Sequence, residues 1–234
     1  MAIKVFADGA DLAGMLEMYH EGNVQGFTTN PSLMKAGGVT DYRAFASEVL
    51  DKIRDLPVSF EVFADDEASM EAEAREIASW ADNVYVKIPA LTTQGVSTSG
   101  LVRRLSADGI KVNVTTLFTP EQNHEFIDAV SVDTPSIISI FAGRIADTGV
   151  DPLPIMVDAI EYAASKPGCE ILWASTRELL NIYQAEKIGC HIITVPNAIL
   201  AKRKNVGKDL FEYSLDTVKG FARDIQSLGF HILP

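Results

Sequence analysis

The sequence predicts an α/β fold, a single (β/α)8 TIM barrel with an extra C-terminal helix. Within 234 residues, eight short runs of apolar or β-branched residues begin 20 to 34 residues apart, and stretches with helical periodicity lie between them. This alternation is typical of βα units on a parallel sheet, and eight units in this length suggest a closed barrel. The runs cover residues 4–8, 26–30, 58–63, 84–89, 111–117, 136–143, 170–175 and 190–195. An open doubly wound sheet is the alternative, but no Gly-x-Gly-x-x-Gly motif follows the first run.

Several expected helices carry recognisable start signals. Residues 69–81 place Met70, Ala74, Ile77 and Ala81 on one face of a helix. Thr119-Pro120-Glu121-Gln122 combines an N-cap, a proline at the first helical position and a capping-box glutamine. Directly after the seventh run, Ser175-Thr176-Arg177-Glu178 is a second capping-box pattern. We therefore expect helices after the fifth and seventh strands to begin at these motifs.

The C-terminal part of the chain predicts one long helix on the same domain, which we take to be residues 1–234. Residues 209–228 place leucine, valine, phenylalanine and isoleucine side chains on one side, and the pattern ends at Gly229. The tail, residues 229–234, is apolar for a terminus. We expect it to pack on its own barrel or on a neighbouring subunit.

Composition and charge restrict the class of protein. Twenty basic and 32 acidic side chains give a net charge of −12, which argues against nucleic-acid or anionic-membrane binding. A phosphorylated substrate requires arginines placed locally. Cys169 and Cys190 are too few for a disulfide scaffold, and we expect two free thiols in a reducing cytoplasm. We expect no signal peptide and no membrane span, since the N-terminus turns acidic early and no apolar run approaches ~20 residues.

Polar side chains gather at the expected carboxyl ends of the strands, where catalytic residues of such barrels lie. Residues two apart share a face of a strand, so the pairs at 28 and 30, 113 and 115, and 139 and 141 each point the same way. This set is more polar than a barrel interior needs. Its members are Asp8, Thr28, Asn30, Glu61, Lys87, Asn113, Thr115, Ser139, Phe141 and Ser175.

Lys87 is the most informative of these residues because it lies within an expected buried strand, Val84-Tyr85-Val86-Lys87-Ile88-Pro89. Burial disfavours a charged ammonium, and a neutral amine can attack a carbonyl to form a Schiff base. The alternatives are a lysine on an edge strand, pointing to solvent, or one in a structural ion pair. The acidic and hydroxyl residues at equivalent strand ends favour the nucleophile.

Asp8 and Glu61 could divide the proton transfers that a Schiff-base enzyme requires, although one of them could merely neutralise the lysine. A metal site built from Asp8, Glu61 and Asn30 is conceivable, but no histidine lies at the carboxyl end of a strand. We interpret the histidines as structural; they are His20, His124, His191 and His231.

Arg144 and Arg177 follow the sixth and seventh runs and suggest an anion site. We expect Arg177 at a helix N-terminus, where an oxyanion is also favoured. The alternative is that the arginines form surface ion pairs with Asp147 or Glu178.

These motifs closely resemble the transaldolase family, including its short subfamily and the fructose-6-phosphate aldolases. The resemblance spans about residues 5–195 in order. It rests on Gly26-Phe27-Thr28-Thr29-Asn30-Pro31-Ser32-Leu33, on the strand that carries Lys87, and on three later motifs. These are Asn113-Val114-Thr115, Ser139-Ile140-Phe141-Ala142-Gly143-Arg144-Ile145 and Ala174-Ser175-Thr176-Arg177.

The resemblance implies a mechanism in which Lys87 forms an imine with C2 of a ketose phosphate. It implies that Asp8 takes the C4 hydroxyl proton, and that Glu61 and Thr115 hold a water that relays protons. It further implies that amide and hydroxyl groups bind a dihydroxyacetone unit, and that a second set binds the phosphate. The first set is Asn30, Asn113 and Ser139, and the second is Arg144, Ser175 and Arg177. No metal and no organic cofactor is implied.

The resemblance favours transfer to an aldose phosphate, in carbohydrate metabolism of the pentose phosphate type. Relatives that work as aldolases tend to carry Gln and Tyr where this chain has Glu61 and Phe141. A lyase that releases dihydroxyacetone, an enzyme for a sulfonated sugar and a non-catalytic sugar-phosphate-binding barrel remain alternatives. Gly9, Trp173 and Thr176 depart from the family pattern. A short family member with an apolar last helix is expected to be a homo-oligomer, a pentamer or decamer.

Overall fold

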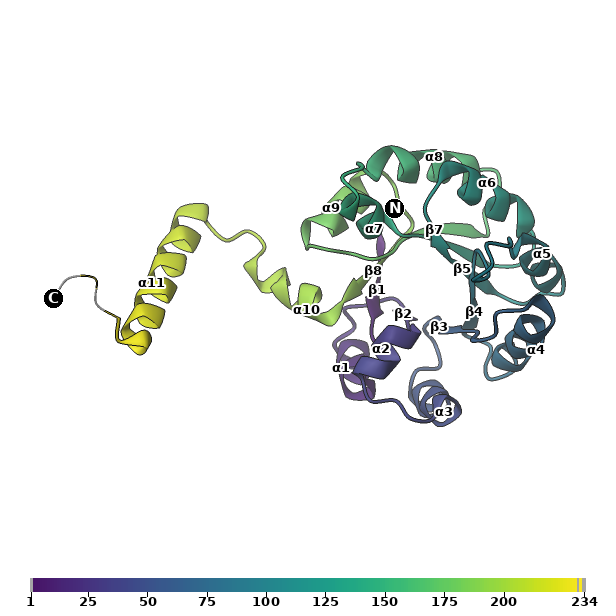
Figure 1. Cartoon of the computed structure of the whole chain (residues 1–234), viewed down its shortest axis with the longest axis horizontal. Coiled ribbons are helices and arrows are strands. Elements are labelled where there is room, and N and C mark those ends of the chain that lie inside the picture. The colour runs from purple at the N-terminus through teal and green to yellow at the C-terminus, as the bar shows by residue number, and fades with distance from the viewer. Residues whose placement is uncertain (1, 231, 233–234) are drawn as a thin grey trace. The chain divides into compact units, whose positions relative to one another are not determined.

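The computed structural model describes residues 2–230 and 232 and has a closed barrel in which eight parallel strands pair in sequence order. Figure 1 shows the ring of strands with helices around its outside. The (β/α)8 fold is therefore confirmed. The strands are β1 (Lys4–Asp8), β2 (Phe27–Thr28), β3 (Val58–Glu61), β4 (Val84–Pro89), β5 (Val112–Leu117), β6 (Ser136–Ile140), β7 (Cys169–Trp173) and β8 (Ile192–Pro196).

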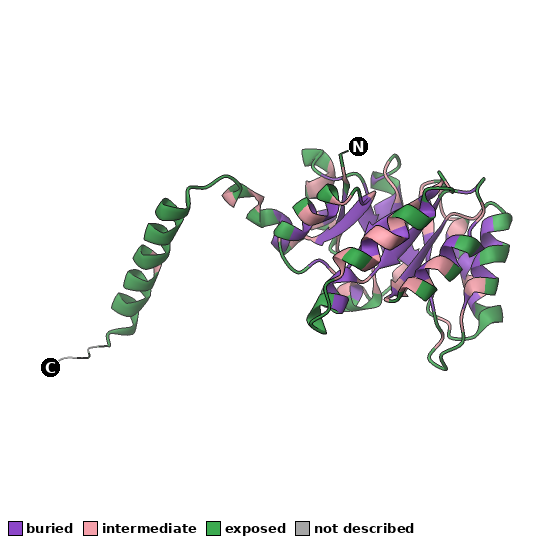
Figure 2. Ribbon diagram, turned by 90° about the horizontal axis from the view of Figure 1, so that it is seen from above, coloured by how far each residue is buried: buried purple, intermediate pink, exposed green. Residues whose placement is uncertain are grey.

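Helices follow the strands and cover the barrel, with their buried faces toward the sheet (Figure 2). They are α1 (Leu12–Glu21), α2 (Pro31–Ala36), α3 (Tyr42–Lys52), α4 (Glu67–Ala78), α5 (Ser99–Ala107), α6 (Pro120–Ala129), α7 (Ala142–Asp147), α8 (Leu153–Ala163), α9 (Leu180–Lys187) and α10 (Asn197–Leu200). Residues 1–200 form one compact unit, which contains the barrel.

The capping motifs had different outcomes. Thr119 and Gln122 form the expected capping box at the start of α6. The second expected box is wrong, because α9 begins only at Leu180 and its N-cap side chain makes no hydrogen bond. Ser175 has φ +64°, and the Asn181 side chain accepts the backbone N–H groups at residues 177 and 178. A positive φ at the serine is incompatible with the extended backbone that an N-cap adopts.

The apolar run at residues 136–143 is not one strand. It ends as a strand at Ile140, and α7 begins at Ala142. Ala142 and Gly143 are both buried, so the run is equally apolar across the boundary. A short apolar run cannot reveal by itself where a buried strand gives way to a buried helix.

A separate inner core closes the barrel beneath its carboxyl end. Phe6, Ile137, Leu172 and Ile192 are almost fully buried and pack together inside the ring of strands. Gly26 is required beside this core, because a Cβ there would lie 2.6 Å from the Phe6 ring. These side chains form an apolar floor under the polar residues of the strand ends.

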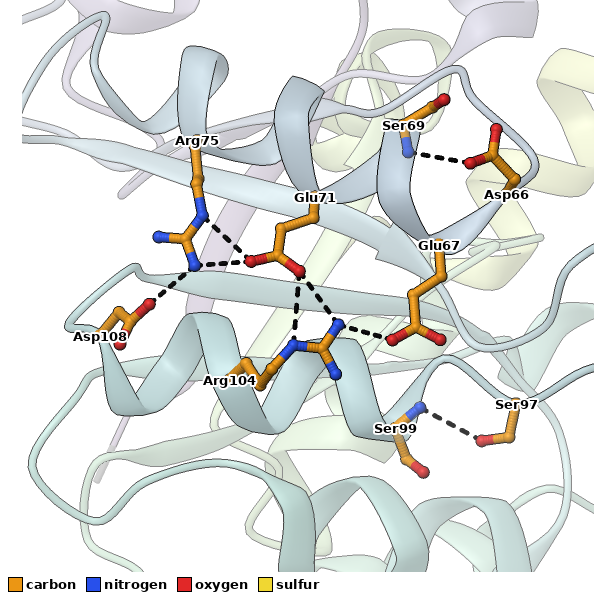
Figure 3. Close-up of polar contacts among 9 residues, drawn as sticks. All are labelled: Asp66, Glu67, Ser69, Glu71, Arg75, Ser97, Ser99, Arg104 and Asp108. Atoms are coloured by element: carbon orange, nitrogen blue, oxygen red, sulfur yellow. Dashed lines mark hydrogen bonds and ion pairs between the residues drawn. The ribbon is translucent and has the colours of Figure 1, made fainter.

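An exposed ion network joins α4 to α5 on the outside of the barrel (Figure 3). Arg75 bridges Glu71 and Asp108, each at 2.7 Å. Arg104 bridges Glu67 at 2.5 Å and Glu71 at 3.0 Å. We call these five residues the α4–α5 ion network.

Residues 201–234 form a second compact unit. They contain a 3₁₀ helix at Ala201–Asn205 and α11 (Leu210–Leu228), which confirms the expected last helix. Asp209 caps α11 and Gly229 ends it in the left-handed conformation. Every apolar side chain of α11 is exposed. Of the expected tail, residues 231, 233 and 234, including His231, lie outside the described residues. None of the helices in the described part of the chain is long and apolar enough to cross a bilayer.

Candidate active site

A cavity of about 360 Å³ opens at the carboxyl ends of the strands. It is lined by all of the predicted site residues except Asn113 and Arg177. The predicted residues on its wall are Asp8, Thr28, Asn30, Glu61, Lys87, Thr115, Ser139, Phe141, Arg144 and Ser175. The strand-end prediction thus identified one shared cavity.

Lys87 lies inside the barrel, and its side chain is buried. Its Nζ donates to the Thr29 carbonyl at 2.9 Å and lies 3.2 Å from Glu61 Oε2. Glu61 and Lys87 are register partners on β3 and β4, which explains why their side chains meet. The edge-strand alternative is wrong because the barrel is closed, whereas the ion pair with a carboxylate is present.

Asp8 faces the same cavity from β1. The Thr28 hydroxyl donates to Asp8 Oδ1 at 2.8 Å. Burial raises the pKa of the Asp8 carboxyl above 3.8, whereas the Lys87 charge and the Thr28 hydrogen bond act in the opposite direction. The site therefore places two carboxylates, Asp8 and Glu61, around one amine.

Thr115 provides an uncommitted hydroxyl on the wall of the cavity. It is 1% exposed, and its Oγ1 has no hydrogen-bond partner among the described residues. Buried hydroxyls are normally satisfied. A water or a substrate oxygen in the cavity would satisfy this one.

A buried polar chain supports the wall at β3, β5 and β6. The Ser139 hydroxyl donates to Asn113 Oδ1 at 2.6 Å, and Asn113 Nδ2 donates to Ser59 Oγ at 3.0 Å. Asn113 does not line the cavity in this structure. Ser59 was missed by the sequence analysis, although it shares a face with Glu61, two residues away.

The next part of the wall is built from α7 and the loop after β7. Gly143 is required there, because a Cβ would lie 1.6 Å from the Ser175 carbonyl oxygen. Ser175 and Thr116 both have φ +64°, an uncommon conformation for residues other than glycine, and both line the cavity. The Arg144 guanidinium lies over the Phe141 ring, 5.0 Å from its centroid. Arg144 is the cation on this wall.

The two predicted anion-site arginines differ in placement. Arg177 does not line the cavity and pairs instead with Asp147, one of the two partners considered from the sequence. It precedes α9 and is not at that helix's N-terminus. Of the two arginines, Arg144 is the one that faces the cavity directly.

Thr194 on β8 is the second residue that the sequence analysis missed. Its hydroxyl lies 2.5 Å from that of Thr28, and it lines the cavity. The run at residues 190–195 is mostly apolar, but period-two parity from the buried Ile192 would have placed Thr194 inside the barrel.

The remaining candidates lie away from the cavity. His191 Nδ1 accepts the Ile171 backbone N–H, and His124 Nε2 lies 2.7 Å from Asp158 Oδ2. Both cysteines are free and buried. Burial raises the pKa of Cys169 to about 11 and that of Cys190 to about 12, which makes both thiols poor nucleophiles.

Comparison with known proteins places this chain in a family. The family model described as Transaldolase/Fructose-6-phosphate aldolase matches residues 5–232. The chain belongs to the transaldolase/fructose-6-phosphate aldolase family. Two relatives, each named probable transaldolase, come from Streptococcus pyogenes serotypes M5 (strain Manfredo) and M49 (strain NZ131). Each is 36% identical to this chain over 206 residues, which cover 86% of this chain and 89% of the relative.

Solved structures support the barrel fold of this transaldolase/fructose-6-phosphate aldolase family member. A 3-hexulose-6-phosphate synthase has a TM-score of 0.56 at 18% identity, covering 86% of this chain and 92% of its own. KGPDC from Streptococcus mutans has a TM-score of 0.57 at 12% identity, covering 88% of this chain and 93% of its own. At these identities the likeness concerns the fold alone.

Proposed function

We propose that the protein is a transaldolase, which transfers a dihydroxyacetone unit from a ketose phosphate to an aldose phosphate through a Schiff base on Lys87. The observation that carries this proposal is the buried Lys87 amine, 3.2 Å from Glu61, in a cavity that Asp8 also lines. An amine flanked by two carboxylates can be deprotonated, attack a carbonyl and be served by separate acid–base groups.

The first step is imine formation. Glu61 takes a proton from the Lys87 ammonium, and Nζ then attacks C2 of the ketose. The resulting carbinolamine loses water, which leaves a protonated imine. Thr115 and Glu61 both line the cavity, and the uncommitted Thr115 hydroxyl could hold the water that carries these protons.

The second step is cleavage. Asp8 accepts the proton of the C4 hydroxyl, and the C3–C4 bond breaks. Its electron pair moves into the imine and gives an enamine on Lys87, while the former C4 leaves as the carbonyl of an aldose. The raised pKa of Asp8 suits a carboxylate that must both accept and return a proton.

The third step is transfer. The enamine carbon attacks the carbonyl of the acceptor aldose, and Asp8 returns its proton to the new hydroxyl. Water then hydrolyses the imine, releasing the product ketose and the Lys87 amine. No metal ion or organic cofactor is required for this scheme.

The substrates that we propose are anionic sugars. Donors of the fructose 6-phosphate or sedoheptulose 7-phosphate type and acceptors of the erythrose 4-phosphate or glyceraldehyde 3-phosphate type match the scheme. Thr28, Asn30 and Ser139 would bind the dihydroxyacetone unit directly. Asn113 would act through the Ser139 hydroxyl that it accepts. Asn30 Oδ1 caps α2 by accepting the Leu33 N–H, which leaves the amide NH₂ for the substrate.

The anionic end would bind Arg144 and Ser175, with Arg177 as a further cation once it leaves Asp147. A sulfonate could replace the phosphate. This chemistry belongs to carbohydrate metabolism of the pentose phosphate type. A cytoplasmic location is consistent with the two free cysteines.

Transfer is favoured over release of free dihydroxyacetone by Phe141. Its ring lies 5.7 Å from that of Phe118 and beneath Arg144, and the Phe141 side chain itself has no hydroxyl that could hold a water beside the enamine. A lyase needs a proton donor there to convert the enamine into a hydrolysable imine.

Product analysis tests the proposal. Fructose 6-phosphate should be consumed rapidly only when erythrose 4-phosphate is present, and Phe141→Tyr should increase dihydroxyacetone release without acceptor. Borohydride added with the donor should attach substrate to Lys87, as shown by peptide mass mapping. Equal rates with and without acceptor would favour the lyase. An adduct elsewhere, or none during turnover, would contradict the Schiff-base assignment, and no turnover with Lys87 unmodified would favour a binding protein.

We also propose a homo-oligomer, a pentamer or decamer, that covers α11. This helix has exposed leucine, valine, phenylalanine and isoleucine side chains and no buried residue (Figure 2). An unpartnered apolar face of this kind favours association. Light scattering should give several times the 25.4 kDa chain mass, whereas the chain mass itself would refute the proposal.

A further inference from the structure

Thr194 occupies a position in the cavity for which the mechanism above gives no role. It lies on β8 and is 4% exposed. Its Oγ1 is 2.5 Å from Thr28 Oγ1, which in turn is 2.8 Å from Asp8 Oδ1. Three side chains from β8, β2 and β1 therefore form one hydrogen-bonded chain that ends on the carboxylate.

The direction of this chain follows from the number of protons available. An ionised carboxylate only accepts hydrogen bonds, so Thr28 must donate its single hydroxyl proton to Asp8. The short contact between the two threonines then requires Thr194 to donate to Thr28. When Asp8 gains a proton, the order can reverse, with Asp8 donating to Thr28 and Thr28 to Thr194. The chain can therefore satisfy Thr28 in either protonation state.

Thr194 is itself held firmly on two sides. Its backbone pairs with Phe6 on β1, and its carbonyl accepts the buried Thr176 hydroxyl at 2.7 Å. A β-branched side chain has few χ1 rotamers, so a fixed backbone also fixes the hydroxyl. Thr176 follows Ser175 directly, so the loop after the neighbouring strand β7 helps to place Thr194.

We propose that Thr194 is a positioning residue for Asp8, which acts by donating to Thr28 and thereby holding the Thr28 hydroxyl on the carboxylate. The inference rests on the proposed function, in which Asp8 accepts the substrate proton. Its effect is indirect, because the Thr194 hydroxyl reaches Asp8 only through Thr28. Hydrogen bonds in such a chain polarise one another, so losing the first weakens the second.

The charged groups that face Asp8 would remain when Thr194 is changed. Lys87 on β4 lowers the pKa of Asp8, and Glu61 on β3 raises it. Arg144 on α7 is the other charged residue on the cavity wall, and Thr28 and Thr194 are uncharged. A weaker Thr28 hydrogen bond should therefore raise the pKa of Asp8 further.

Thr194→Val tests the inference because it keeps the side-chain shape and removes the hydroxyl. We expect kcat for donor cleavage to fall about three- to tenfold with little change in KM, the size expected for one hydrogen bond. The acidic limb of the pH profile should move to higher pH. Thr194→Ser is the matched control because it keeps the hydroxyl. It should have the rate of the unmodified protein and an acidic limb at the same pH as in the unmodified protein.

A double variant tests whether Thr194 acts through Thr28. If it does, Thr28→Val and Thr28→Val/Thr194→Val should have nearly equal rates, because the second change removes a bond already lost. Multiplicative losses would show independent roles and would overturn the inference.

Titration of ¹³C-labelled aspartate carboxyls in the substrate-free protein separates this inference from the proposed function. The Asp8 signal, assigned by its loss in Asp8→Asn, should titrate at higher pH in Thr194→Val than in the unmodified protein and Thr194→Ser. An unshifted titration overturns the inference even if Lys87 is trapped. A shifted titration with no Lys87 adduct would leave the hydrogen-bonded chain in place and reject the proposed function.

Discussion

The barrel carries two clusters of opposite charges that differ in burial. Lys87, Glu61 and Asp8 meet inside the strand ends, where the Lys87 and Glu61 side chains are 8% and 14% exposed. The α4–α5 ion network has more ion pairs, but its Arg104 side chain is 48% exposed (Figure 3). Water and salt screen the interaction between exposed charges, so exposed pairs affect each other's protonation little. Burial removes this screening, so charges in a buried cluster strongly shift the protonation equilibria of their neighbours. We therefore propose the chemistry for the buried cluster, although it has fewer ion pairs.

The same change of a cation to methionine should have very different effects in the two clusters. Lys87→Met removes the amine that we propose forms the imine, so turnover should fall roughly 10⁴-fold or more. Arg104→Met should leave turnover within about twofold of the unmodified protein, since this residue only links two helices at the surface. Steady-state rates with donor and acceptor measure both. Substantial activity in Lys87→Met would contradict the proposal that the buried cluster, unlike the exposed one, is catalytic.

Removing a carboxylate from the buried cluster should lower activity and raise stability at neutral pH. Asp8→Asn should lower turnover by about 10²- to 10⁴-fold, the range for a general acid–base group. Because the pKa of Asp8 is raised above 3.8 in the folded chain, the unfolded chain loses this proton more readily. Stability is therefore lost as pH rises from 3.8 through the raised value.

Thermal unfolding measures this effect. Asp8→Asn should unfold at a higher temperature than the unmodified protein at pH 7, and the gain should disappear in acid. Asp108→Asn, in the exposed network, is the control and should give no such gain. A lower unfolding temperature for Asp8→Asn at pH 7 would mean that the carboxylate stabilises the fold.

The arginines near the cavity sharpen the comparison. Arg144→Ala should raise KM for phosphorylated donors, because a charge-assisted hydrogen bond contributes about 1.5–3 kcal/mol. Arg177→Ala should have a smaller effect, since Asp147 already engages that guanidinium. Unphosphorylated substrates should be much less affected by either change. Equal losses on both substrate classes would identify these arginines as structural.

The smallest effect is expected from salt. Raising ionic strength should reduce the small difference in Tm between the unmodified protein and Arg104→Met, because exposed pairs are screened. The activity loss of Lys87→Met should not decrease when ionic strength is raised. A Tm difference that persists at about 1 M salt would indicate that Arg104 contributes mainly through packing of its side chain.

The sequence predicted the barrel and much of the cavity for one physical reason: side chains alternate along strands, and the carboxyl ends of parallel strands meet. This reasoning predicts that Asp8, Glu61 and Lys87 lie close together, as they do in the structure. It missed Thr194 and Ser59, because a hydroxyl in an apolar run is also compatible with ordinary strand structure.

Other features of the site could not follow from residue types. The Thr29 carbonyl that accepts from Lys87 is a backbone group, and any residue carries one. Ser175 looked like an N-cap, but its positive φ depends on the loop that Gly143 approaches closely. The pairing of Arg177 with Asp147 joins residues 30 positions apart and was only one of two partners considered.

The apolar floor has a kinetic consequence. Phe6, Ile137 and Ile192 are at most 1% exposed and seal the barrel beneath Lys87. In the proposed reaction, a sugar bound to Lys87 would therefore enter and leave only through the opening at the strand ends. The first aldose has to diffuse away before the second enters by the same route, so the two never share the site. Double-reciprocal plots at several fixed acceptor concentrations should then be parallel lines. Parallel lines indicate a ping-pong order, which a cavity with a single opening would impose.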